Sequence, residues 1–240
     1  MSQVSPSPYA DIAVGITPDT GKRTLADTVY DRMRWDIVRG ELPPGMPLRL
    51  EQLKDRYSAG FSPLREALNR LQGERLVVSQ SLRGFVVAPL SRDEMNDAID
   101  ARILVEGEAL QRAIRNGGDA WEAEILAAAH ELTKSLRRAS DGFDVDMTDL
   151  ERRHRRFHHA LIAACGSTRL LRMADTLYME TERYRLTALH RSVDLGERDV
   201  CTEHEALVRA VLARDEDAAA ALLTEHYRDT GRQMESVLTA

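Results

Sequence analysis

The segment from Phe61 to Gln72, with the sequence FSPLREALNRLQ, constrains the fold more than any other part of the chain. Its apolar residues recur at i, i+3, i+4 and i+7, which predicts a helix with one buried face. Ser62 is a good N-cap, and Pro63 suits the first helical position, where its missing N–H costs nothing. The apolar face comprises Leu64, Ala67, Leu68 and Leu71, and the opposite face comprises Ser62, Arg65, Asn69 and Gln72.

The polar face of this expected helix has the chemistry of a surface that contacts DNA. Its side chains can hydrogen-bond to base edges or to phosphates, and none of them is acidic. A short helix that exposes such a face fits the major groove. A solvated amphipathic helix is nevertheless the simpler interpretation of the pattern alone, so the flanking sequence has to decide between the two.

The flanking sequence completes a winged helix-turn-helix. Two helices are expected before the segment and two strands after it, at residues 24–39, 50–57, 76–78 and 85–87. The break at residues 58–60 places the third helix after a tight turn. The polar turn at residues 81–84 joins the two strands and carries Arg83 at its tip. Three helices and a hairpin with a basic tip therefore predict a DNA-binding domain.

These residues resemble the N-terminal domain of GntR-type bacterial transcription regulators. The resemblance rests on VYDRMRWDIVRGELPPGMPLRLEQL, SPLREAL and LRGFVV, and it covers residues 24–89. It implies that the domain binds operator DNA. The residues expected to contact DNA are Arg49, Ser62, Arg65, Asn69, Arg83 and Gly84.

Three positions depart from the pattern of this family. Phe61 stands where relatives usually carry an arginine that reads guanine, so it is expected either to touch a thymine methyl group or to pack inside the domain. Arg75 stands where relatives often carry glycine, which can require a left-handed backbone. Arg49 does not align with the family's arginine on the second helix, and it is expected to contact phosphate at most.

From residue 91 onward the sequence predicts helices and no strands. Ser91 followed three residues later by Glu94 forms a capping box for the first of them. The others are expected at residues 119–139, 147–164, 168–190, 200–213 and 215–238. Six helices with short connections indicate an all-α antiparallel bundle.

The chain of 240 residues is long enough for two domains with separate cores. We expect a flexible arm at residues 1–22, a winged helix-turn-helix domain at 23–90, and an all-helical effector-binding and dimerisation domain at 91–240. The fold class is therefore mainly α. Residues 22–90 carry twelve Lys and Arg against eight Asp and Glu, whereas residues 91–240 carry twenty-one against twenty-nine. The basic surplus thus lies where DNA phosphates would need it.

Other features of the sequence indicate a bacterial cytoplasmic protein. No apolar run reaches the roughly 18 residues that a membrane-spanning helix needs. No charged segment followed by an apolar stretch opens the chain, so we expect no signal peptide. Cys165 and Cys201 are the only cysteines and fit no metal spacing, as expected of reduced cytoplasmic thiols. We expect no membrane partner, and association with the nucleoid when DNA is bound.

Four histidines form a second informative pattern. His154 and His158 lie four residues apart on one expected helix, so both imidazoles project from the same face. His204 and His226 lie on the last two expected helices. Spacing of this kind commonly holds a divalent metal. Seven histidines in a chain of this length also produce such a pair by chance, so the spacing alone leaves both interpretations open.

The histidines lie in segments that resemble the effector domain of the FadR-like branch of the GntR family. The segments are RHRRFHHALIAACGSTRLL and EHEALVRAVLARDEDAAAALLTEHY. The resemblance implies a metal held by an Asp-x3-His pair and by one His on each of two later helices. Three family ligands match His158, His204 and His226, and His154 replaces the usual Asp but can still ligate. Four nitrogen ligands favour zinc, with nickel as the alternative. No ligand position matches His130, His159 and His190, which are expected to be ordinary surface or packing residues.

Arg102, within the segment DARILVEGEAL, resembles the arginine of the family's Arg-x3-Glu pattern. That arginine commonly points towards the effector pocket, where a guanidinium can hold a carboxylate through two hydrogen bonds. The alternative is an i, i+4 ion pair with Glu106, worth about 0.2–0.5 kcal/mol on an exposed helix.

The sequence therefore predicts an effector-responsive transcription regulator, expected to be a repressor, and no enzyme. A homodimer would bind a pseudo-palindromic operator, and the helical domain would sense a small organic acid. The segment HRRFHHALIAACGS looks most like a subgroup that senses dicarboxylates such as glutarate or related hydroxy acids. One alternative is a zinc hydrolase, but Arg155 stands where such enzymes carry a glutamate base beside the first histidine. The other is an architectural DNA binder with a purely structural metal.

Overall fold

The computed structural model describes residues 24–80, 84–191 and 198–238. Its first three helices are α1 (Leu25–Val38), α2 (Leu50–Tyr57) and α3 (Phe61–Gly73). Helix α1 begins with a capping box, since Thr24 accepts a hydrogen bond from the backbone N–H of Asp27 and the Asp27 carboxylate accepts one from the N–H of Thr24. Helix α2 ends where Ser58 adopts a left-handed conformation with φ of 50°. The expected arm at residues 1–22 and the expected wing residue Arg83 lie outside the described residues.

Helix α3 begins earlier than the sequence predicted. Its N-cap is Gly60, which has extended backbone angles, so the prediction that Ser62 caps the helix is wrong. Pro63 remains in the first turn, where backbone N–H groups have no intrahelical acceptor to lose. The periodicity was nevertheless predicted correctly, because the four expected apolar residues are fully buried. These are Leu64, Ala67, Leu68 and Leu71.

The winged domain also contains a three-stranded antiparallel sheet, whose first strand precedes α3 in the chain and whose other two strands follow α3. The strands are β1 (Pro47–Leu48), β2 (Val77–Gln80) and β3 (Gly84–Val87), in the order β1-β3-β2. The hairpin of β2 and β3 is the expected wing. Strand β1 was not predicted, since two residues are too few to show an alternating pattern.

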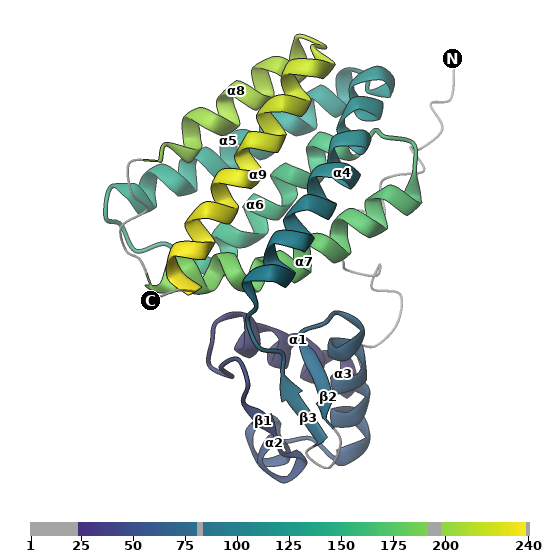
Figure 1. Cartoon of the computed structure of the whole chain (residues 1–240), viewed down its shortest axis with the longest axis vertical. Helices are drawn as coiled ribbons and strands as arrows, with labels where there is room; N and C mark the ends of the chain where they lie inside the picture. The colour runs from purple at the N-terminus through teal and green to yellow at the C-terminus, as the bar shows by residue number, and fades with distance from the viewer. Residues whose placement is uncertain (1–23, 81–83, 192–197, 239–240) are drawn as a thin grey trace, which may run out of the picture.

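All described residues after Ser91 that form regular structure are helical. The helices are α4 (Arg92–Asn116), α5 (Asp119–Ser140), α6 (Met147–Ile162), α7 (Thr168–Arg191), α8 (Val200–Leu212) and α9 (Glu216–Leu238). Ser91 accepts a hydrogen bond from the N–H of Glu94, as expected of the N-cap of α4. Helix α4 packs along α9 and α7, and α5 packs along α6, so the six expected helices form one bundle (Figure 1). In the described part of the chain, no helix combines the length and the apolar character that crossing a membrane requires.

Two separate hydrophobic cores stabilise the molecule. One lies between α1, α2, α3 and the sheet and contains Met33, Leu64 and Leu68 among its fully buried side chains. The other runs through the bundle and contains Phe157 and Leu110. The fold is thus mainly α, with a winged helix-turn-helix followed by a helical bundle.

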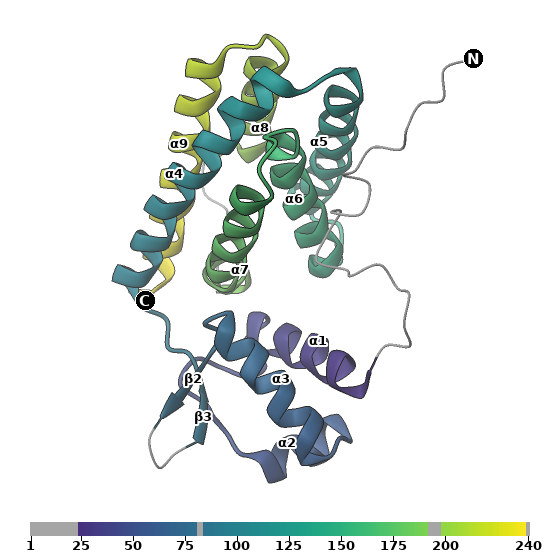
Figure 2. The same cartoon turned by 90° about the vertical axis from the view of Figure 1, so that its right-hand side faces the viewer.

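The winged domain touches the bundle through helix α1, which lies beside one end of α7 (Figure 2). Polar contacts cross this boundary. Arg34 pairs with Glu182, Arg75 lies 3.6 Å from Glu180, and Arg39 donates a hydrogen bond to Thr148. Helix α7 therefore contacts both the bundle core and the winged domain.

Candidate metal centre and DNA-binding face

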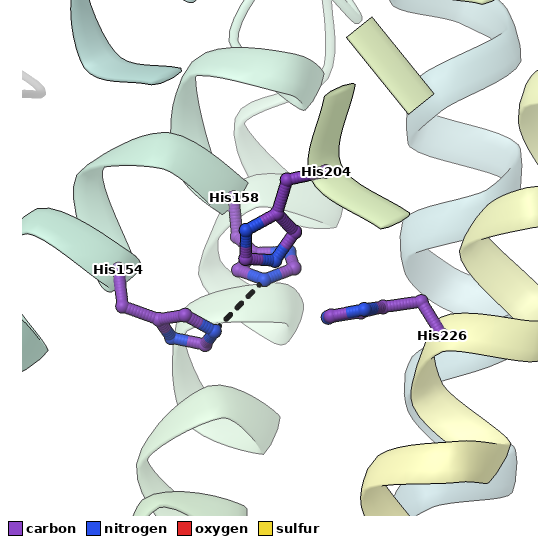
Figure 3. Close-up of side chains that lie close together, drawn as sticks. All are labelled: His154, His158, His204 and His226. Atoms are coloured by element: carbon purple, nitrogen blue, oxygen red, sulfur yellow. Dashed lines mark hydrogen bonds between the residues drawn. The ribbon is translucent and has the colours of Figure 1, made fainter. Parts of the chain in front are cut away.

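The bundle brings the four predicted histidines together. Helix α6 carries His154 and His158, and helices α8 and α9 carry His204 and His226 (Figure 3). One ring nitrogen from each lies within 4.8 Å of the others. The Nε2 atoms of His154 and His158 are 3.2 Å apart. Two nitrogens bound to one tetrahedral zinc at ordinary Zn–N distances lie about 3.3 Å apart, so this pair already has the spacing of two ligands.

Burial keeps these imidazoles in the form that binds metals. His158, His204 and His226 are buried, and His154 is partly buried. Removal from water lowers the pKa of all four rings below the ordinary value of 6.5, because the charged imidazolium is poorly solvated there. Neutral imidazole has a free lone pair, which is the requirement for a metal ligand.

Polar partners hold the outer nitrogens of three rings. The Tyr178 hydroxyl lies 2.8 Å from Nδ1 of His154, and the Tyr227 hydroxyl lies 3.2 Å from Nδ1 of His158. Because these contacts occupy Nδ1 of both rings, the Nε2 atoms of His154 and His158 face the centre of the cluster. Partners of this kind fix the orientation of metal-bound histidines in proteins.

The third outer partner is a carboxylate. Glu203 Oε2 lies 2.8 Å from Nδ1 of His226. Burial acts to raise the pKa of Glu203, but hydrogen bonds from His226 and Arg198 outweigh it and lower that pKa to about 2. An ionised Glu203 accepts the Nδ1–H of His226, which again directs Nε2 inward.

His204 differs from the other three. Both of its ring nitrogens are buried, and neither has a hydrogen-bond partner among the described residues. A buried polar atom without a partner costs free energy, about 1–3 kcal/mol. A metal ion would satisfy one of these nitrogens, so the residues present fit a metal site.

The carboxylates next to the cluster are already paired with arginines. Glu106, which accepts a hydrogen bond from Tyr227, pairs with Arg102. Glu151 forms an ion pair with Arg185, and Glu203 forms one with Arg198. Within the described residues, no contacting carboxylate is left to balance the charge of a divalent ion.

Arg102 forms the ion pair that the sequence left as the alternative to effector binding. It is buried, and its Nε donates to Glu106 at 2.7 Å. Its two other nitrogens donate to Thr181 at 3.0 Å and to Tyr227 at 3.1 Å. Two of its three partners are therefore neutral hydroxyls.

Of the described residues expected to contact DNA, three line one groove of the winged domain. Arg49, Ser62, Arg65 and Asn69 are all exposed, and Gly84 opens strand β3 with φ of 75°. A groove of about 550 Å³ runs between α2, α3 and the wing, and Arg49, Arg65 and Gly84 line it. The groove thus places Arg49 and Arg65, together with Glu51, beside the backbone of Gly84, where no side chain keeps a phosphate away.

Two departures from the family pattern have structural consequences. Phe61 is 43% exposed, and the Lys54 ammonium lies 5.6 Å from its ring centre, so it does not pack inside the domain. Arg75 has φ of 57°, the left-handed conformation that the missing glycine suggested. Arg70, also on α3, pairs with Asp27 at 2.7 Å and stacks on Tyr30, which ties α3 to α1.

Sequence reasoning missed several residues of the centre. Tyr227 and Glu203 each adjoin a predicted histidine in the chain, and that adjacency was a usable signal. Tyr178 has no such signal. Of the histidines expected to lie outside the site, His130 is exposed and His159 is partly buried beside the cluster. The side chain of His190 lies outside the described residues.

Comparisons with known proteins agree with this architecture. Residues 25–87 match the gntR family of bacterial regulatory proteins, and residues 97–229 match the FCD domain. The HTH-type transcriptional repressor GlaR of Escherichia coli is 41% identical over 83% of this chain and 92% of its own length. The HTH-type transcriptional regulator BphR of Paraburkholderia xenovorans is 38% identical over 95% of this chain and 89% of its own length.

A solved structure shows the same fold. E. coli McbR/YncC matches with a TM-score of 0.73 at 20% identity, over 90% of this chain and 99% of the other. The sequence matches cover both the winged domain and the bundle. The chain therefore belongs to the GntR family of bacterial regulatory proteins, with an FCD domain after its winged helix-turn-helix, and is a DNA-binding transcription regulator rather than an enzyme.

Proposed function

We propose that this regulator is a repressor whose operator binding is controlled by a small organic acid bound at a metal ion, and that His154, His158, His204 and His226 hold the metal. The observation that carries the proposal is the convergence of these four rings around His204, whose buried nitrogens have no partner among the described residues. The carboxylates that contact the cluster are paired with arginines, so the unsatisfied imidazole of His204 favours a ligand at this position.

Zinc is the proposed metal. Four neutral imidazole nitrogens suit zinc or nickel, whereas magnesium and manganese prefer oxygen ligands. Tetrahedral zinc accepts four protein ligands, and it can expand to admit a fifth from solvent or from an effector. When bound, the ion would supply a Lewis acid that attracts a carboxylate.

Charge is the reason for proposing an acid as the effector. The four histidines contribute no negative charge, and the carboxylates that contact the cluster are paired with arginines. A divalent ion would therefore bring its full +2 charge into a largely desolvated core, where uncompensated charge is unfavourable. An anionic effector would remove that penalty. A dicarboxylate such as glutarate is the proposed class, in line with the resemblance of the segment around His158.

Arg102 is the proposed second anchor for this acid. Its Nε would continue to donate to Glu106 when the acid binds. Its other two nitrogens, which donate to the hydroxyls of Thr181 and Tyr227, could then donate to the acid. A carboxylate would replace one of these neutral acceptors by a charged one, and hydrogen bonds between charged groups are the stronger kind.

The proposed DNA contacts come from the start of α2, from α3 and from the wing, and the residues are Arg49, Ser62, Arg65, Asn69, Arg83 and Gly84. Of these, Arg49, Arg65 and Gly84 line the groove. Since one winged domain reads only a few base pairs, we propose a homodimer on a pseudo-palindromic operator in the bacterial cytoplasm. The E. coli relative GlaR is named a repressor, which supports that direction of control. Light scattering that returned a monomer mass with and without operator DNA would contradict the dimer.

To test this function, the zinc-loaded protein is first used to select an operator from random duplex DNA. Fluorescence anisotropy then measures the operator Kd in the presence of glutarate, 2-hydroxyglutarate, other dicarboxylates and matched monocarboxylates. We expect at least one acid to change the operator Kd by about 5-fold or more. Adding a metal chelator should abolish this change. An operator affinity that no acid alters would instead favour an architectural DNA binder with a structural metal.

A zinc hydrolase is disfavoured by the residue beside the first histidine. Arg155 pairs with Asp175 at 3.1 Å and cannot act as the general base that such enzymes place there.

A further inference from the structure

A buried ion pair joins the bundle to the winged domain. Arg34 of α1 donates through Nη2 to Glu182 of α7, and both side chains are buried. The Nε atom of Arg34 also lies 3.9 Å from Oε2 of Glu74. Tyr30, one turn earlier on α1, donates its hydroxyl to the other oxygen of Glu74. Arg34 thus lies between a carboxylate of the bundle and a carboxylate of the winged domain.

Glu74 is the C-cap of α3, which we call the recognition helix because it carries Ser62, Arg65 and Asn69 of the proposed DNA contacts. Its backbone N–H closes the last turn of α3 on the carbonyls of Arg70 and Gln72. Tyr30 hydrogen-bonds one oxygen of Glu74, and the charge of Arg34 attracts the other oxygen at 3.9 Å without a hydrogen bond, so both residues of α1 act on this end of α3. A shift of Arg34 would therefore change the electrostatic attraction on this end of α3.

The same helix α7 reaches the histidine cluster one turn before Glu182. Tyr178 contacts Nδ1 of His154 at 2.8 Å, and it lies four residues before Glu182, which places both side chains on one face of α7. Tyr178 and Arg185 both donate to Glu151 on α6, which holds this face against the cluster. One helical turn thus separates the contact with the cluster from the contact with α1.

We propose that Arg34 is a positioning residue that couples the state of the histidine cluster to the recognition helix, through Glu182 on one side and Glu74 on the other. This inference rests on the proposed function, since it concerns how a signal from that site reaches DNA. A buried ion pair resists separation strongly because each partner would be left as an unpaired charge away from water. Arg34 and Glu182 must therefore move together.

The other contacts across the boundary do not have this character. Arg75 and Glu180 lie 3.6 Å apart, but the Arg75 side chain is 75% exposed, and solvent screens such a pair. Arg183 donates to the backbone carbonyl of Ala88, which attaches α7 to the segment after the wing rather than to α3. Glu180→Gln is therefore a matched control for Glu182→Gln, since it makes the same change on the same helix at the same boundary.

Amide hydrogen exchange at residues 61–75, measured on the full chain with zinc and in a chelator, tests the coupling. In the wild-type protein and in Glu180→Gln, zinc should slow this exchange by about 5-fold or more. In Glu182→Gln, calorimetry should give the wild-type zinc affinity. Zinc should then slow amide hydrogen exchange in the bundle but not at residues 61–75. A zinc response at residues 61–75 that survives in Glu182→Gln, or that is absent from the wild-type protein although zinc binds, would overturn the proposal.

Two further measurements keep the test decisive. The double variant Arg34→Met and Glu182→Met replaces the pair by apolar side chains of similar length, which commonly preserves a fold. If Glu182→Gln does not fold, the double variant takes its place with the same expected loss of response. If zinc does not bind the wild-type protein, the proposed function fails, and His154→Ala then perturbs the cluster instead. An exchange change at residues 61–75 that is caused by His154→Ala and is lost with Glu182→Gln supports the coupling, and any other result overturns it.

Discussion

The hydroxyl of Tyr178 donates its proton to Glu151, while its oxygen lies 2.8 Å from Nδ1 of His154. The oxygen can therefore only accept from His154, which assigns the proton of that ring to Nδ1. The Nε2 lone pair is then free and faces the cluster. One phenol thus sets the tautomer that a metal ligand at this position needs.

Removing this hydroxyl should weaken metal binding. In Tyr178→Phe, His154 loses the acceptor that fixes its tautomer and orientation, and loss of such a partner typically lowers metal affinity about 10–100-fold. Competition against a fluorescent zinc chelator measures the change. Tyr184→Phe is the control, because its hydroxyl on the same helix contacts Ser91 and Arg183 instead of a histidine. Equal zinc affinity in the two variants would refute the assigned role of Tyr178.

Arg65 is expected to supply a specific contact with DNA, since it is exposed on α3 and lines the groove with Arg49. Arg65→Ala should weaken binding to the selected operator by about 1–3 kcal/mol. Anisotropy titrations at fixed salt measure the loss. Arg112→Ala is the control, because Arg112 pairs with Glu108 on the bundle helix α4. Operator affinity that stays at the wild-type value in a folded Arg65→Ala protein would contradict the assigned face.

The left-handed backbone of Arg75 predicts a stabilising substitution. A side chain at φ of 57° is strained by about 1–2 kcal/mol, and glycine relieves this strain but loses more chain entropy on folding. Arg75→Gly should therefore raise the free energy of unfolding by about 0.5–1 kcal/mol, as measured by urea denaturation. Glu180→Gln reports separately on the exposed ion pair that Arg75→Gly also removes. A lower free energy of unfolding, after that correction, would show that the conformation is unstrained.

The capping box of α1 predicts a dependence on acid pH. Hydrogen bonds from the side chain and backbone of Thr24, and then from Arg70, lower the pKa of Asp27 from 3.8 to about 2. The unfolded chain therefore takes up a proton at a higher pH than the folded chain does. The stability that Asp27 contributes is fully present above pH 3.8 and is lost as the pH falls towards 2.

Denaturation at fixed pH values between 2 and 5 checks this dependence. Asp27→Asn should lower the free energy of unfolding at neutral pH and should flatten its slope between pH 4 and 2. Asp55→Asn, which changes an exposed carboxylate on α2, should leave that slope as it is in the wild-type protein. An unchanged slope in Asp27→Asn would contradict the lowered pKa.

Local patterns and the family resemblance predicted much of the fold and the four histidines of the centre. The buried face of α3 follows from the spacing of Leu64 and Leu68, and the four histidines were found from their spacing and from the family resemblance. The N-cap was placed at Ser62 because serine is the better cap by type, whereas the helix begins at Phe61, directly after the turn, and Gly60 is its N-cap. Tyr178 and Arg34 were missed because their roles come from contacts with residues 24 and 148 positions away, His154 and Glu182. No local pattern encodes such pairs.

Calorimetry of the operator-active acid shows whether the metal holds the effector. The acid is titrated into zinc-loaded protein, metal-free protein, His154→Asp, and the exposed control His130→Asp. We expect full binding to the zinc-loaded protein and to His130→Asp, and none to the metal-free protein. Binding to His154→Asp should be weaker, because its carboxylate reduces the positive charge of the site. Undiminished binding to folded, metal-free protein would show that the metal only ties the helices together and does not hold the effector.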